Sequence, residues 1–216
     1  MALVEGNKTA DRRVPMGTTY SFSHNQNAGA DGHLVIIIAS PSIVTNSVTY
    51  GGQSMSLVRQ DYLSTTYGTD WSVWELDAPP TGVNTVQVTL ASTSWQGVST
   101  VCYSFTGSNG VGNTSAGLSA VVDRTTNLTI ANNSMVIGSC IGGNSTNAYI
   151  AIPQGTNRPI DWNHNINNYT WGGISPSLSS GTITIQGGST STNVIMAIEV
   201  EEAAAPPPTR RRIIIC

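Results

Sequence analysis

Residues 33–40 read His-Leu-Val-Ile-Ile-Ile-Ala-Ser, a continuous apolar run with three consecutive isoleucines. A short run of this kind is typical of a strand that is buried on both faces. Its length suits a strand better than a helix, and no window of the chain shows a sustained helical period. The run therefore predicts the centre of a β-sheet protein.

Further strand patterns lie on both sides of this run and are separated by turn residues. Residues 47–58 predict a hairpin in which Gly51 and Gly52 supply the positive φ of a tight turn. The other predicted strands are 18–23, 70–76, 84–90, 97–105, 118–122, 128–131, 134–141, 182–186 and 193–200. Residues 106–117 are predicted to be a loop, and 144–176 carry no clear assignment. The pattern predicts an all-β fold, a two-sheet β-sandwich of the jelly-roll or Greek-key type.

The two halves of the chain share an order of patterns. An apolar run (33–40, then 134–141) is followed by an alternating strand (84–90, then 182–186) and by a second apolar strand (97–105, then 193–200). The similarity lies in the pattern and not in identical residues, so we interpret it as symmetry within one sandwich. We predict one β-sandwich domain over residues 1–202 and a separate arm over residues 203–216.

The arm reads Ala-Ala-Ala-Pro-Pro-Pro-Thr-Arg-Arg-Arg-Ile-Ile-Ile-Cys. Because proline fixes φ, its first half predicts an extended, semi-rigid spacer. An apolar, β-branched segment beyond the spacer gains free energy when it is covered. We predict a docking arm whose contact residues are Arg210, Arg211, Arg212, Ile213, Ile214 and Ile215. The alternative is that these residues fold back as an edge strand of their own domain.

Charge is divided unevenly between the body and the arm. Residues 1–202 hold twelve acidic and six basic residues, so their charge is 6 − 12 = −6, and the arm adds +3 to give the net −3. Arm and body therefore attract each other, within or between subunits. The acidic body argues against a nucleic-acid partner. No stretch approaches the roughly 20 apolar residues of a membrane span, and the absence of a signal-peptide pattern predicts synthesis in a cytoplasm.

No motif in the sequence predicts catalysis. The nucleophile motif Gly-x-Ser-x-Gly is absent, and the neighbouring acids Glu75 and Asp77 are more typical of a solvated strand face than of a paired catalytic site. The three cysteines, Cys102, Cys140 and Cys216, lack the spacing of a disulfide framework or a zinc site. We therefore predict no enzymatic activity, no cofactor and no metal site.

The segment from Asp161 to Trp171 has the composition of a sugar-binding surface, in which aromatic faces contact the ring and polar groups bind the hydroxyls. Its candidate glycan-binding residues are Asp161, Trp162, His164, Tyr169 and Trp171. The alternative is an ordered loop whose aromatic side chains pack on the core. The remaining histidines are predicted to lie outside any site, His33 as a buried structural residue and His24 as a solvated residue in a polar loop.

Residues 33–107 carry a recognisable sequence of motifs. A Val-Thr-Tyr-Gly-Gly hairpin (48–52) precedes a Pro-Pro-Thr-Gly turn (79–82), a Val-Gln-Val strand (86–88) and a Tyr-Ser-Phe-Thr-Gly strand (103–107). This layout resembles the jelly-roll modules of tailed-phage structural proteins and of bacterial surface proteins. The resemblance implies a virion structural protein and, as our expectation, a capsid decoration (cement) protein anchored through its terminal segments. It transfers no functional residue.

The implied partners are other virion proteins, namely the major capsid protein or tail proteins, and copies of the same chain. Neither nucleic acid nor a membrane is expected as a partner. A carbohydrate-binding adhesin or a tail-fibre module is the alternative, with host glycans as ligands. In the preferred mechanism the arm adds a strand to an exposed sheet edge. Its arginines are expected to pair with Glu199, Glu201 and Glu202 of another copy.

Overall fold

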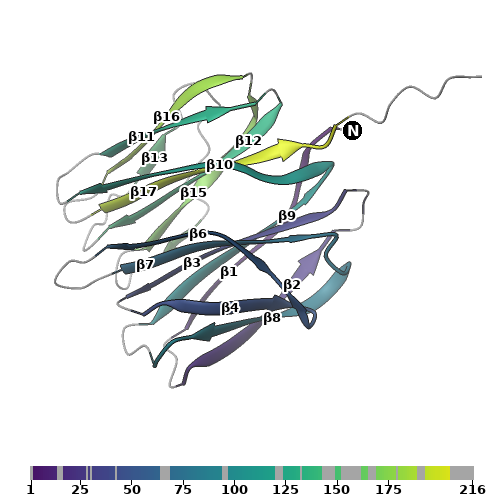
Figure 1. Cartoon of the computed structure of the whole chain (residues 1–216), viewed down its shortest axis with the longest axis vertical. Coiled ribbons are helices and arrows are strands. Elements are labelled where there is room, and N and C mark those ends of the chain that lie inside the picture. The colour runs from purple at the N-terminus through teal and green to yellow at the C-terminus, as the bar shows by residue number, and fades with distance from the viewer. Residues whose placement is uncertain are drawn as a thin grey trace, which may run out of the picture.

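The structure is a computed structural model. It describes residues 2–13, 17–27, 29, 31–41, 43–63, 69–93, 97–119, 124–131, 133–142, 149–151, 162–164, 169–178, 180–188 and 193–204. These residues form four antiparallel sheets, stacked as layers (Figure 1). The prediction of an all-β sandwich is confirmed, but the described residues build four sheets where two were expected.

The first half of the chain builds two of the sheets. The N-inner sheet has the order β1 (Val4–Arg13), β9 (Val98–Thr106), β3 (His33–Pro41), β7 (Thr69–Asp77) and β6 (Ser56–Leu63). The N-outer sheet has the order β2 (Thr19–Gln26), β8 (Gly82–Leu90), β4 (Thr45–Tyr50) and β5 (Gln53–Ser54). The predicted hairpin joins β4 to β5, and Gly51 and Gly52 have φ of 56° and 82°. The pairings are nested, because β1 pairs with β9, β2 with β8, β3 with β7 and β4 with β5.

The second half repeats this topology. The C-inner sheet has the order β10 (Ser108–Ser119), β17 (Asn193–Glu202), β12 (Ser134–Gly142), β15 (Tyr169–Leu178) and β14 (Trp162–His164). The C-outer sheet has the order β11 (Arg124–Ile130), β16 (Gly181–Gly188) and β13 (Tyr149–Ala151). Counted from the start of each half, the inner order is 1-9-3-7-6 in the first half and 1-8-3-6-5 in the second, and the two orders agree once the short strand β5 of the first half is left out of the count. The shared sequence pattern therefore reflects a topology that occurs twice among the described strands.

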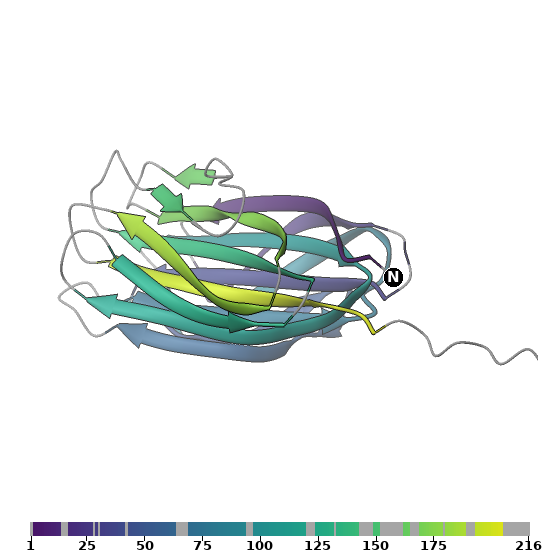
Figure 2. The same ribbon diagram turned by 90° about the horizontal axis from the view of Figure 1, so that it is seen from above.

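The two inner sheets face each other, so the N-inner sheet is covered on both sides. Leu34, Ile36 and Ile38 of β3 belong to a core shared with the N-outer sheet. Val35, Ile37 and Ala39 alternate with them and belong to a second core, which contains Met196 and Ile198 of the C-inner sheet. The continuous apolar run of β3 is thus explained, because neither of its faces meets water. The view from above shows the strands of the stacked sheets aligned roughly along one common axis, with arrows pointing both ways (Figure 2).

Of the described strands, β13, β14 and most of β15 lie in the range 144–176, which carried no assignment, and β1 and β10 were not predicted. Residues 106–117 were predicted to be a loop, whereas β10 occupies most of that range. Strand β1, with the sequence Val-Glu-Gly-Asn-Lys-Thr-Ala-Asp-Arg-Arg, was not predicted either. Both are edge strands with one strand partner each, β17 and β9 respectively. A strand that is held by pairing and is partly exposed needs no alternating apolar pattern, and therefore gives little signal in the sequence.

The prediction that His24 lies in a solvated loop is wrong. It belongs to β2 and is buried between the N-outer and N-inner sheets. Its Nδ1 lies 2.9 Å from Thr9 Oγ1 and its Nε2 lies 2.7 Å from Ser104 Oγ. The polar sequence around it alternates strictly with depth in β2, so the polar residues at positions 24 and 26 point inward.

Stability is expected to fall on mild acidification because of His24. Burial lowers its pKa to about 4, whereas the unfolded chain has a value of about 6.5. The unfolded state therefore binds the proton first, and the free energy of unfolding should fall by about 3 kcal/mol as the pH drops through this window. Urea titrations between about pH 7 and about pH 5 measure the early part of the loss, above the range of most carboxylates. A His24→Gln variant with an equally steep pH dependence would contradict this assignment.

Candidate functional site

Both ends of the described chain meet at Gly107, the single residue between β9 and β10. The N–H of Ala203 donates to the Gly107 carbonyl at 2.8 Å. On its other side, a Cβ placed on Gly107 would lie 2.3 Å from the carbonyl oxygen of Ala2. The first and last strands, β1 and β17, therefore enter and leave the body side by side (Figures 1 and 2). We call this region, defined by Ala2, Gly107 and Ala203, the terminal end.

Gly107 is required at this position for two reasons. Its φ is +65°, a left-handed conformation that residues with a Cβ adopt at a cost. The approach of the Ala2 carbonyl also leaves no room for a methyl group. The chain thus passes from the first sandwich to the second within one residue.

Carboxylates gather around the terminal end. The carbonyl of Asp31 accepts the N–H of Ser108, which places Asp31 beside the start of β10. Asp77 ends β7 with its side chain 87% exposed. Glu201 and Glu202 end β17, immediately before Ala203. The region from which the predicted arm departs is therefore acidic, whereas the arm carries three arginines.

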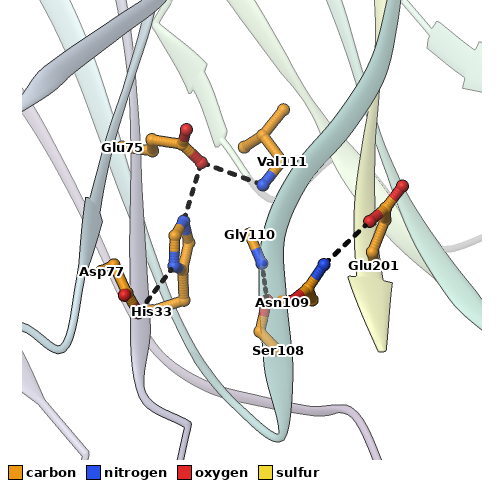
Figure 3. Close-up of polar contacts among 8 residues, drawn as sticks. All are labelled: His33, Glu75, Asp77, Ser108, Asn109, Gly110, Val111 and Glu201. Atoms are coloured by element: carbon orange, nitrogen blue, oxygen red, sulfur yellow. Dashed lines mark hydrogen bonds and ion pairs between the residues drawn. The ribbon is translucent and has the colours of Figure 1, made fainter. Parts of the chain in front are cut away.

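A polar cluster joins the two halves next to the terminal end (Figure 3). Glu75 Oε2 lies 2.9 Å from His33 Nε2 and accepts the N–H of Val111 at 2.9 Å. Burial raises the pKa of Glu75, but its hydrogen bonds to His33 and Val111 outweigh burial and hold that pKa below its usual value. His33 is buried, as predicted, and its Nδ1 lies 3.9 Å from Asp77 Oδ1. The cluster ties β3 and β7 of the first half to β10 of the second.

The interpretation of Glu75 and Asp77 as a solvated pair is therefore correct for Asp77 alone. Glu75 is 27% exposed and engaged with His33. This arrangement places a carboxylate on either side of one imidazole, and the second carboxylate lies beyond hydrogen-bond distance. The contacts of Glu75 with His33 and Val111 connect the two halves and indicate a structural role for this carboxylate.

Among the described residues, each half also buries one carboxylate. Asp70 in the first half accepts the N–H of Thr45 at 3.2 Å and the side-chain amide of Gln60, and burial raises its pKa. Glu199 in the second half is completely buried between the C-inner and C-outer sheets. Its oxygens accept the N–H of Ala131 at 2.6 Å, the hydroxyl of Ser134 at 2.7 Å and the N–H of Asn113 at 3.0 Å.

The expectation that Glu199 pairs with an arginine of another copy is therefore wrong. Its side chain has no exposed surface and its oxygens are already hydrogen-bonded within the second half. Glu201 and Glu202 are partly exposed, and they stay in the proposal as partners. The predicted arm contacts, Arg210, Arg211, Arg212, Ile213, Ile214 and Ile215, lie outside the described residues.

Four of the five candidate glycan-binding residues are brought together in one strand pair. The register of β14 with β15 places Trp162 opposite Trp171 and His164 opposite Tyr169. Strand β14 is the edge strand of the C-inner sheet. Asp161, the fifth candidate, lies outside the described residues.

Sequence reasoning did not identify the terminal end. Gly107 is one of 22 glycines, and nothing near it in the sequence indicates that Ala2 and Ala203 lie against it.

Of the cysteines, Cys102 is buried as predicted, and burial raises the pKa of its thiol. Among the described residues, no three His, Cys, Asp or Glu side chains are grouped to hold a metal ion. The same part of the chain contains no helix of the length and apolarity needed to cross a membrane.

In a comparison with known proteins, no family model and no curated protein matches the sequence.

Proposed function

We propose that this chain is a non-enzymatic virion structural protein of a tailed phage, and specifically a capsid decoration protein anchored through its terminal segments. The observation that carries the proposal is the terminal end, where both ends of the described chain emerge beside Gly107. A body whose two ends leave from one place can be fixed to a surface there while its remaining surface faces outward. The acidic residues at this end and the basic arm add electrostatic complementarity between neighbouring copies.

We further propose that each half is a jelly roll. The nested pairing of β1 with β9, β2 with β8, β3 with β7 and β4 with β5 supports this assignment for the first half. In the second half β10 pairs with β17, β11 with β16 and β12 with β15. Folds of this kind carry many functions, so the assignment agrees with the resemblance of residues 33–107 and does not establish the role.

The position of β17 supports docking of the arm away from its own inner sheet. β17 has β10 on one side and β12 on the other, so it is a central strand. Both sides of β17 are therefore already paired, and a Pro-rich spacer follows Ala203. An arm that adds a strand to the sheet edge of a neighbour would gain main-chain hydrogen bonds, and its isoleucines would gain burial.

Deletion of residues 206–216 is expected to abolish attachment to particles and to leave the body folded. The test adds purified full-length or truncated protein to virions that lack it, and measures occupancy by sedimentation and gel densitometry. Replacing Arg210, Arg211 and Arg212 together by alanine should weaken attachment, more so at high salt, because charge pairing is screened. Arg13→Ala removes an arginine of the body that is 52% exposed and should not change occupancy. Full occupancy by the truncated protein would refute the anchoring role of the arm.

A carbohydrate-binding module is the second candidate, and the β14–β15 register favours it. For this candidate the full-length chain should bind one or more glycans on an array, and Trp162→Ala should lose that binding, because an aromatic face supplies most of the contact with a sugar ring. Tyr62→Ala alters an aromatic side chain that is 52% exposed on β6 in the other half, and should keep binding. Equal loss in both variants, or no binding by the full-length chain, would reject the candidate.

A further inference from the structure

The one Asn-Gly dipeptide of the sequence, Asn109-Gly110, lies at the start of β10 beside the terminal end. The register of β10 with β17 shifts here, since Ser108 pairs with Glu202 and Gly110 with Glu201. Asn109 falls between these two pairs, in the position of a β-bulge, and is exposed. The dipeptide therefore sits at an irregular point of an edge strand, where the ladder is interrupted.

The groups around this dipeptide are arranged as Figure 3 shows. The N–H of Gly110 donates to Ser108 Oγ at 3.0 Å, and the side-chain amide of Asn109 donates to Glu201 Oε2 at 3.2 Å. Gly110 has a φ of +106°, and a Cβ there would lie 3.2 Å from Glu75 Oε2 and from His33 Cε1. Glycine is thus favoured at position 110 by the packing of Glu75 and His33 against it, and residue 110 has no side chain of its own that would hinder attack of its nitrogen on Asn109 Cγ.

We propose that Asn109 is a site of spontaneous covalent modification, namely deamidation through a cyclic imide. The backbone nitrogen of Gly110 gives its proton to hydroxide and attacks Asn109 Cγ, so that a new C–N bond forms. The bond from Cγ to Nδ2 then breaks, and the amide nitrogen leaves as ammonia after taking up a proton from water. Water opens the imide at one of its two carbonyls, which yields aspartate or isoaspartate. Nothing is oxidised or reduced, and water is the co-reactant.

Deamidation changes the charge at the start of β10, beside the terminal end. A carboxylate at position 109 replaces the amide that donates to Glu201, so a hydrogen bond is lost and two like charges face each other. The isoaspartate form also lengthens the backbone by one methylene, two residues before Val111, whose N–H donates to Glu75. The modification therefore loosens the start of β10, where the two halves and both chain ends meet.

The test is incubation of the full-length protein at mildly alkaline pH, followed by cleavage after Arg59 and Arg124 and tandem mass spectrometry of the 60–124 fragment. As internal controls, this fragment also contains Asn84 and Asn113, each followed by a threonine whose branched side chain hinders ring closure. We expect conversion at Asn109 to be several-fold faster than at either control and to rise with hydroxide concentration. In the Asn109→Gln variant the fragment should keep its mass.

Two results would overturn the proposal. One is an Asn109 that converts no faster than Asn113 in the folded protein, while a synthetic peptide of residues 106–112 converts readily. The other is a conversion rate that does not depend on pH. A separate measurement tests whether the modification destabilises the start of β10. Asn109→Asp should lower the urea midpoint relative to Asn109→Gln near pH 7, and an equal or higher midpoint would refute this destabilisation.

Discussion

Replacing Glu199 by alanine is expected to lower the free energy of unfolding by about 3–5 kcal/mol, because three buried or partly buried donors lose their acceptor and a buried donor without an acceptor costs about 1–3 kcal/mol. The carboxylate accepts two backbone N–H groups, from Ala131 and Asn113, and the hydroxyl of Ser134. The hydroxyl can rotate toward another acceptor, but the two N–H groups are fixed by the backbone. The side chain is completely buried, so alanine also leaves a cavity.

The Glu199→Gln variant is the matched control for this prediction. Glutamine keeps the volume and one carbonyl oxygen, which can still accept from Ala131 and Ser134. Its NH2 group would then face the N–H of Asn113, where the second carboxylate oxygen now lies. Glu199→Gln should therefore lower the free energy of unfolding, but by less than Glu199→Ala. Glu201→Gln, at a partly exposed position, should change the free energy of unfolding little. Urea denaturation measures all three, and an alanine variant within about 1 kcal/mol of the original protein would contradict the role assigned to Glu199.

Gly107→Ala is expected to cost about 2–4 kcal/mol. The left-handed φ alone costs a residue with a Cβ about 1–2 kcal/mol. The added methyl group would in addition meet the Ala2 carbonyl oxygen at 2.3 Å, so the N-terminal segment must shift. We expect the variant to expose the start of β1 to proteolysis and to lower the thermal midpoint.

Gly52→Ala separates the two contributions to this cost. Gly52 has a φ of +82°, and a Cβ there would meet nothing within 4 Å. It therefore measures the backbone strain without the steric contact. If the two variants lose equal stability, the close approach of Ala2 to Gly107 has no energetic weight, and the description of the terminal end would need to be revised.

The sequence predicted the centre of the fold better than its layers. The run 33–40 was identified as a strand buried on both faces, and the alternation in 70–76 matches the placement of Trp71 and Trp74 in different cores. An apolar strand pattern shows that both faces of a strand are covered but does not show which sheet covers each face, so the second pair of sheets was not predicted. The polar edge strands β1 and β10 are held by pairing with β9 and β17, which no local pattern reports.

Glu199 illustrates why the candidate site could not be predicted in full. In the strand Asn-Val-Ile-Met-Ala-Ile-Glu-Val it stands where an acid would mark a solvated face. In the fold that face is covered by the C-outer sheet, and the donors that satisfy Glu199 come from residues 113, 131 and 134. The terminal end likewise arises from contacts between residues about a hundred positions apart in the sequence, Ala2, Gly107 and Ala203. Such contacts follow from topology and not from local composition.

The adjacency of the two chain ends also determines how the molecule would bear a mechanical load. If the body is held at the terminal end, a force that drags it outward is applied where β1 begins and where β17 finishes. Both strands extend from that end through the body, so the force acts along their axes. Ladder hydrogen bonds lie across the strands, and such a force loads those of β1 with β9, and of β17 with both β10 and β12, together as shear. In a protein tethered in this way, many ladder hydrogen bonds resist the force together, and they are not broken one at a time.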